Sequence, residues 1–253
     1  MRLKCTNYFI LLIILFTNNG YCESRDFRQE RKNRIEIESG IVNVGHNNIG
    51  NNANGGALFN TNKIDSSNHN YARFSYYRDI NNRDSVKILV APLAFSGSGN
   101  LDSSFQYGDK NFTEGNAFYK YKFNSYRATY RRKFFENDKI NFKAGLTLKV
   151  RDAAVTLGQG DTVYTQSNIG FVPLFHLNLD YRLTEKIKLS TEGDFMIAPQ
   201  GRAIDFAFTG IYDLNSDVNV SLGYRILEGG AKNDKVYTMS LFNYYFLGFG
   251  VNF

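Results

Sequence analysis

Strict alternation of apolar and polar residues is the feature that most constrains the fold of this chain. From Ile140 to Val150 every even-numbered residue is apolar, whereas the odd-numbered positions include Asn141 and Lys143. Side chains of a β-strand point alternately to its two faces, so this segment predicts a strand with one apolar and one strongly polar face. The same alternation recurs at 169–183, 187–197 and 218–226. The chain is therefore predicted to be all-β.

The connections between these segments differ in length. Tight turns are predicted at 81–84, 136–139, 184–186 and 215–217, and long connections at 45–69, 97–115 and 157–167. Short turns on one side and long loops on the other are typical of transmembrane β-barrels, although a soluble exported β-sandwich also has alternating strands. We predict an antiparallel up-and-down transmembrane barrel of ten strands, with eight as the alternative count. The predicted strands are 34–44, 70–80, 85–97, 117–134, 139–155, 168–183, 187–198, 202–213, 217–228 and 236–253.

The last predicted strand carries bulky apolar residues at every second position. These residues are Tyr245, Leu247, Phe249, Val251 and Phe253. The pattern resembles the C-terminal signature of outer-membrane barrels, which the assembly machinery of that membrane recognises. The resemblance implies that this machinery is a partner of the chain.

The first residues have the pattern of a targeting segment. Arg2 and Lys4 precede an apolar run at 8–16, and a polar stretch follows. A short apolar run after positive charges is typical of a secretory signal peptide, and it is too short to span a bilayer as a helix. We predict a signal peptide at 1–22 and a charged periplasmic lead at 23–33, before a barrel that occupies 34–253.

Cleavage after Cys22 would remove both cysteines of the chain, Cys5 and Cys22. The mature protein would then have neither disulfides nor thiolate metal sites. A lipid anchor on Cys22 is the alternative, but the bulky Tyr21 stands where such anchors have a small residue.

Five sequence blocks resemble an uncharacterised family of outer-membrane barrel proteins. The blocks are FNSYR at 123–127, RDA at 151–153, GFVPL at 170–174, APQGRA at 198–203 and GYRILEGG at 223–230. The resemblance implies a barrel of about ten strands and no particular activity.

The polar faces of the strands would line the barrel interior. The turn at 184–186 places His176 opposite Asp194, and the turn at 215–217 places Asp205 opposite Arg225. Ten strands enclose a narrow lumen, so we predict a salt-bridge network that plugs it, with a small pore lined by the same residues as the alternative. The predicted lumen residues are Arg73, Arg127, Lys143, Lys149, Arg151, His176, Asp180, Glu192, Asp194, Asp205 and Arg225, and Glu36 and Glu38 are further inward candidates.

A second polar group falls at the strand ends assigned to the extracellular side. Its members are Asp152, Gln200, Arg202 and Glu228. They are predicted either to ring the extracellular mouth or to pin the ends of neighbouring strands.

An enzymatic site has little support in the sequence. His176 and Asp194 could form a base and its orienting carboxylate, with Ser190 or Ser221 as nucleophile, as in a lipid acyl hydrolase, but the predicted registers place no serine beside His176. No HExxH, GxSxG or phosphate-binding loop is present, so no metal or cofactor is expected. The formal charge of +6 includes Arg2 and Lys4, so nucleic acid is not an expected partner.

We therefore predict a non-enzymatic integral outer-membrane barrel with a narrow or salt-bridge-plugged polar lumen, in contact with outer-membrane lipids and lipopolysaccharide. Its role would be structural, surface interaction or small-solute diffusion. The alternatives are a lipid-modifying enzyme and a soluble exported β-sandwich.

Overall fold

The computed structural model describes residues 32–52, 54–199, 201–234 and 236–253. The predicted signal peptide at 1–22 lies outside these residues, as does the lead at 23–33 except for its last two positions. In the described ranges, no helix has the length and apolar character needed to cross a membrane.

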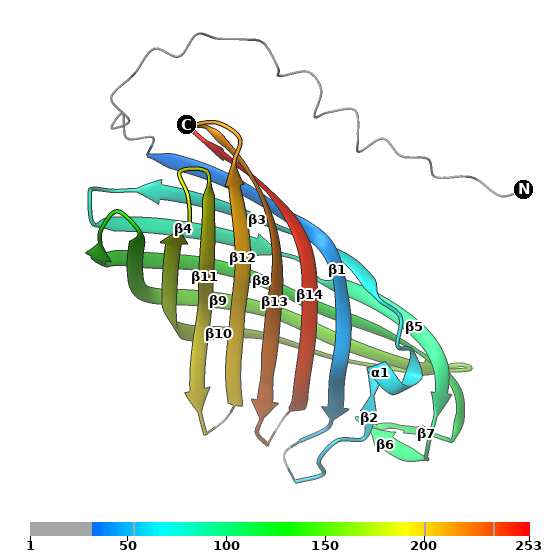
Figure 1. Cartoon of the computed structure of the whole chain (residues 1–253). Coiled ribbons are helices and arrows are strands. Elements are labelled where there is room, and N and C mark those ends of the chain that lie inside the picture. Colours follow the sequence, from blue (N-terminus) through cyan, green and yellow to red (C-terminus); the bar gives the residue numbers. More distant parts are fainter. Residues whose placement is uncertain (1–31, 53, 200, 235) are drawn as a thin grey trace, which may run out of the picture. The chain divides into compact units, whose positions relative to one another are not determined.

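One antiparallel sheet closes on itself to form a barrel of ten strands (Figure 1). Each strand pairs with its neighbours in sequence, and β14 pairs with β1 from Arg34 opposite Asn252 to Gly50 opposite Tyr237. The predicted ten-stranded barrel is confirmed. The eight-stranded alternative is wrong because ten strands form the barrel, and the two-sheet sandwich is wrong because a single sheet closes edge to edge. The strands are β1 (Asn33–Gly50), β3 (His69–Asp79), β4 (Asp84–Ala91) with β5 (Ala94–Leu101), β8 (Gly115–Glu136), β9 (Ile140–Gln159), β10 (Thr162–Arg182), β11 (Ile187–Ala198), β12 (Gly201–Asp213), β13 (Val218–Lys232) and β14 (Tyr237–Asn252).

Two strand predictions need correction near the beginning of the barrel. The first strand, predicted at 34–44, continues to Gly50 through an irregularity between Val44 and His46. The strand predicted at 85–97 is interrupted at Pro92, so β4 and β5 pair with successive parts of β8. Proline has no N–H to donate to a neighbouring strand, which explains the break.

The long loop predicted at 157–167 is also wrong. Most of this segment belongs to β9 and β10, which pair as far as Gln159 opposite Thr162 and are joined by a tight turn. Gly160 has φ +55° in this turn, a conformation that glycine adopts without the steric penalty of a side chain. As a result, β8, β9 and β10 extend well beyond β11 and β12 at one end of the barrel (Figure 1).

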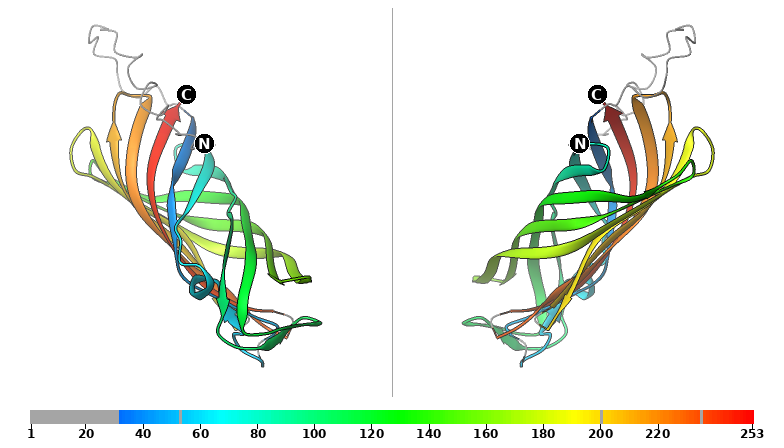
Figure 2. Two further views of the ribbon diagram at one scale, coloured as in Figure 1. Left: turned by 90° about the vertical axis from the view of Figure 1, so that its right-hand side faces the viewer. Right: turned by 90° about the vertical axis from the view of Figure 1, so that its left-hand side faces the viewer.

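The two ends of the barrel differ. At the terminal end, Asn33 N–H donates to the Phe253 carbonyl at 3.0 Å, and short turns connect the strands. At the loop end, the longer connections form a cap of β2 (Phe59–Asn60), α1 (Thr61–Ile64), β6 (Phe105–Tyr107) and β7 (Lys110–Phe112). Figure 2 shows these two ends from the side. The cap packs through aromatic rings: Phe59 stacks on Phe105 at 5.7 Å, and Tyr107 meets Tyr164 of β10 edge to face at 4.9 Å.

The outer face of the sheet is apolar, as the alternation predicts. Phe171 is 72% exposed and Ile197 74% exposed, and the outward positions of β14 hold the predicted signature residues 245, 247, 249 and 251. A water-soluble barrel would have no reason to expose so many large apolar side chains in one band. The inward face of the loop-end half is aromatic as well, with Tyr119, Tyr121 and Phe242 buried.

Candidate functional site

A network of buried charges crosses the middle of the lumen. Arg127 of β8 donates from Nη1 to Asp194 Oδ2 at 2.6 Å and from Nη2 to Asp205 Oδ2 at 2.5 Å. These carboxylates lie on β11 and β12, on the opposite wall of the barrel from β8. One guanidinium therefore connects strands that are not neighbours in the sheet.

The network continues from Asp205 towards β1 and β3. Arg225 Nη1 lies 2.8 Å from Asp205 Oδ1, and Arg225 Nη2 lies 2.7 Å from Glu38 Oε2. Arg73 completes the ring, with Nη2 3.3 Å from Asp205 Oδ2 and Nε 3.9 Å from Glu38 Oε1. The central network thus consists of six side chains: Arg73, Arg127, Arg225, Glu38, Asp194 and Asp205. All six are buried, with at most 12% of each exposed. Charged groups at such depth are stable only when they are paired and hydrogen-bonded, and these are.

His176 adjoins this central network through Asp194. Its Nδ1 lies 2.8 Å from Asp194 Oδ1, which also accepts a hydrogen bond from the Thr147 hydroxyl at 2.7 Å. Its Nε2 has no hydrogen-bond partner among the described residues, and the Glu192 carboxylate lies 3.7 Å away. The adjacent cavity holds only about 20 Å³, enough for about one water molecule.

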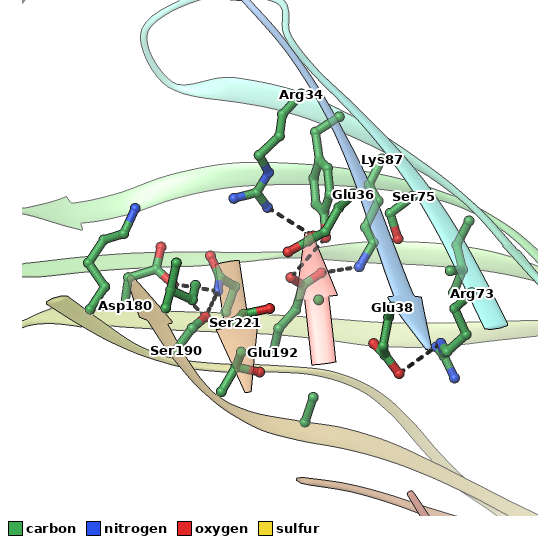
Figure 3. Close-up of a pocket in the computed structure, with 18 of the residues that line it drawn as sticks. Arg34, Glu36, Glu38, Arg73, Ser75, Lys87, Asp180, Ser190, Glu192 and Ser221 are labelled. Atoms are coloured by element: carbon green, nitrogen blue, oxygen red, sulfur yellow. Dashed lines mark hydrogen bonds and ion pairs between the residues drawn. The ribbon is translucent and has the colours of Figure 1, made fainter. Parts of the chain in front are cut away.

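A polar pocket of about 190 Å³ lies on the terminal side of the central network (Figure 3). In it, Lys87 Nζ lies 2.5 Å from Glu192 Oε1, and the Ser190 hydroxyl donates to Asp180 at 2.6 Å. Arg34 donates to Glu36 at 3.5 Å near the opening. Most charges that line this pocket are thus paired with each other.

A larger cavity of about 400 Å³ lies on the loop side of the central network. Its walls combine aromatic and aliphatic side chains with two cations of β9, Lys149 and Arg151, and with the ion pair of Arg202 and Glu228. Arg151 Nη2 donates to Asn168 Oδ1 at 2.6 Å.

The structure places all the predicted lumen residues on inward-facing positions. Five of them belong to the central network: Arg73, Arg127, Asp194, Asp205 and Arg225. His176 contacts the network through Asp194, and Glu192 lies next to His176. Lys143 and Asp180 line the terminal-side pocket instead, and Lys149 and Arg151 line the loop-side cavity. His176 lies opposite Asp194, the register that the turn predicts.

The predicted register of Asp205 with Arg225 is wrong by two residues. Asp205 lies opposite Leu227, and Arg225 lies opposite Ala207. The turn between β12 and β13 lies at the predicted 215–217, and a turn centred on 216 pairs Asp205 with Leu227; the predicted pair assumed a centre at 215, which shifts the pairing by two. The long arginine side chain still reaches the carboxylate diagonally.

Among the described residues, the polar ones predicted at the extracellular mouth form ion pairs between neighbouring strands. Arg202 and Glu228 form an ion pair with each other across β12 and β13, at positions that alternate with the inward ones, and both also line the loop-side cavity. Asp152 likewise pairs with Lys122 across β8 and β9, at 2.8 Å. Each of these two ion pairs joins neighbouring strands. Gln200 lies outside the described residues.

Lys87 is one of the lumen residues that the sequence interpretation missed, and the buried Arg131 is another. Lys87 is the one charged position in the run Val86–Val90, and its immediate neighbours Val86 and Ile88 are apolar. Successive side chains of a strand point to opposite faces, so this pattern could have predicted that Lys87 faces the lumen. The aromatic lining at Tyr119 and Tyr121 was missed because aromatic residues were assigned to the outer face.

No protein-family profile matches this chain, and no curated protein matches it in sequence. Among solved structures, the outer membrane protease OmpT from Escherichia coli aligns with a TM-score of 0.56 at 11% identity, over 88% of this chain and 97% of that chain. Ail, the attachment invasion locus protein of Yersinia pestis, aligns with a TM-score of 0.40 at 11% identity, over 88% of this chain and 99% of that chain. OprG from Pseudomonas aeruginosa aligns with a TM-score of 0.39 at 10% identity, over 88% of this chain and 97% of that chain. The likeness to OmpT shows a shared barrel fold; the family resemblance of the five sequence blocks stays a prediction.

Proposed function

We propose that this chain is a non-enzymatic integral protein of the bacterial outer membrane whose lumen is closed by the central network. In this proposal the loop end faces outside the cell and serves surface interaction, and the terminal end faces the periplasm. The observation that carries it is the bridge of Arg127 to both Asp194 and Asp205 across the lumen.

The composition of the central network supports closure. Its three guanidinium groups, Arg73, Arg127 and Arg225, face three carboxylates, so the charges balance within it. A balanced and fully paired network leaves no surplus charge to attract an ion, and bidentate arginine pairs hold a fixed geometry. We therefore expect the network to act as a rigid plug rather than as the lining of a pore.

Single-channel recording in a planar bilayer tests the proposal. The refolded protein is expected to be silent, whereas a variant with Arg73→Ala, Arg127→Ala and Arg225→Ala is expected to show discrete conductance steps. Arg202→Ala removes a guanidinium outside the central network and serves as the control that stays silent. A different mobility of unheated and boiled samples on gels verifies that each variant is folded. Discrete steps from the wild-type barrel, altered by Arg151→Ala or Arg225→Ala, would overturn closure and favour the small pore.

The environment of His176 supports a non-enzymatic role. Among the described residues no serine hydroxyl bonds to His176, and the adjacent cavity of about 20 Å³ cannot admit an acyl chain or a peptide. Mass spectrometry of lipids from cells that overproduce the wild type or His176→Ala tests the lipid-hydrolase alternative, and incubation of both proteins with a peptide library tests proteolysis. Products made by the wild type and not by the variant would contradict the proposal.

A further inference from the structure

The cavity on the loop side of the central network has the size and lining of a ligand site. Its volume of about 400 Å³ falls in the range of about 300–1,000 Å³ that is usual for small-molecule pockets. The apolar part of its wall includes Tyr121 of β8, Val155 of β9, Met196 of β11 and Phe242 of β14. An apolar wall of this extent favours a ligand with a hydrocarbon or aromatic body.

The barrel wall is incomplete beside this cavity. β10 pairs with β11 only between Phe175 opposite Phe195 and Arg182 opposite Lys188, so its first half, Thr162–Leu174, pairs with β9 alone. Pro173, which has no N–H to donate, lies where this pairing stops and lines the cavity. The gap adjoins the apolar outer band, since Phe171 and Ile197 flank it. A hydrophobic molecule therefore has a route between the cavity and the apolar surroundings of the barrel.

Two cations of this cavity have no carboxylate partner. Lys149 is only 3% exposed, and no hydrogen bond or ion pair joins its ammonium group to any described residue. Its Nζ lies 4.8 Å from the centroid of the Phe123 ring. Arg151 donates to the neutral side chain of Asn168, and its Nε has no partner in the described part of the chain. Glu228 also lines this cavity, but its carboxylate is paired with Arg202, and Asp152 at the same end is paired with Lys122. A buried cation without an anion is unfavourable, so an anionic group is the missing partner.

We propose that this cavity binds a single-chain amphipathic anion, a long-chain carboxylate, with the acid group at Lys149 and Arg151 and the chain along the apolar wall. A neutral hydrocarbon would leave both cations without an anion, and a sugar phosphate would leave the apolar wall without an apolar partner. This inference goes beyond the proposed function and does not depend on whether the lumen conducts ions.

Equilibrium binding of cis-parinaric acid, a fluorescent long-chain carboxylate, to the full-length barrel in lipid nanodiscs tests the proposal. Saturable binding above that of empty nanodiscs is expected, with displacement by palmitate and none by the alcohol of the same chain length. Lys149→Met and Arg151→Gln are each expected to weaken binding about tenfold or more, because each removes one charge-assisted contact to the acid group.

Lys143→Met is the matched control. Lys143 lies six residues before Lys149 on β9 and also faces the lumen, but it lines the pocket on the terminal side of the central network. Its replacement is expected to leave binding unchanged. The proposal is overturned if the wild type shows no saturable binding, if acid and alcohol displace the probe equally, or if folded Lys149→Met and Arg151→Gln bind like the wild type. The comparison of acid with alcohol needs no variant, so a variant that fails to fold leaves the test intact.

Discussion

Arg127 Nη2 lies 2.5 Å from Asp205 Oδ2, although the two residues are 78 positions apart and stand on strands that do not pair. The contact exists only because the sheet closes and brings β8 and β12 to face each other across the lumen. The stability of the barrel therefore depends on an ion pair between Arg127 and Asp205, which stand on strands that are not joined as a hairpin.

Replacement of Arg127 by methionine is expected to lower the free energy of unfolding by about 3–5 kcal/mol. The change leaves Asp194 and Asp205 buried with one guanidinium fewer, and an uncompensated buried charge is costly. Urea unfolding in lipid vesicles, followed by tyrosine fluorescence, measures the effect. Arg202→Met breaks an exposed ion pair outside the central network and should cost less than about 1 kcal/mol. Equal losses in the two variants would show that the central network does not stabilise the barrel more than a surface pair does.

Leu247→Arg tests whether the apolar band faces lipid. Leu247 lies on the outward face of β14 and is 67% exposed. In a bilayer, an arginine near the midplane of the lipid-facing surface costs about 2–4 kcal/mol, whereas on a water-facing surface it costs little. The free energy of unfolding in vesicles should fall by that amount, and Gln106→Arg in the exposed part of the cap should leave it nearly unchanged. An unchanged stability of Leu247→Arg would contradict the transmembrane assignment.

The first half of β10 should exchange amide hydrogens unevenly. Between Thr162 and Leu174 only the groups directed to β9 have a strand partner, whereas from Phe175 to Arg182 the strand is paired on both sides. Hydrogen exchange followed by NMR in micelles should show alternating fast and slow amides in the first stretch and slow amides throughout the second. Uniform protection of both stretches would mean that the wall has no gap.

Asp65, in the connection after α1 and outside the strands, should lose part of its acidity in Ser67→Ala. The Ser67 hydroxyl donates to its carboxylate at 2.6 Å and the Ser67 N–H at 2.9 Å, and these bonds hold the pKa of Asp65 below its ordinary value. A lowered carboxyl pKa stabilises the fold above the ordinary value, and this contribution disappears as the pH falls through the lowered pKa. NMR titration should therefore find a higher pKa for Asp65 in Ser67→Ala than in the wild type, while Ser66→Ala should not change it.

Period-two alternation predicted much of this structure from the sequence. It gave the inward direction of residues as distant as Arg73 and Arg225, because strand geometry alone decides which face a side chain takes. It failed at Pro92 and at 157–167, where a missing N–H and a glycine turn changed the strand ends. Register was harder than direction: the turn after β12 lies at the predicted 215–217, but a centre taken one residue too early paired Asp205 with Arg225 in place of Leu227.

The sequence by itself determined the class of fold and the polar interior, since both follow from local periodicity, but it left the number of strands open between eight and ten. Only the tertiary structure decided which charges meet. Arg127 reaches Asp194 and Asp205 because barrel closure sets opposite walls within side-chain reach. Lys149 has no ion-pair partner among the described residues, and the one carboxylate that lines its cavity, Glu228, is paired with Arg202. Such relations depend on strand stagger and on distances across the lumen, which local patterns do not encode.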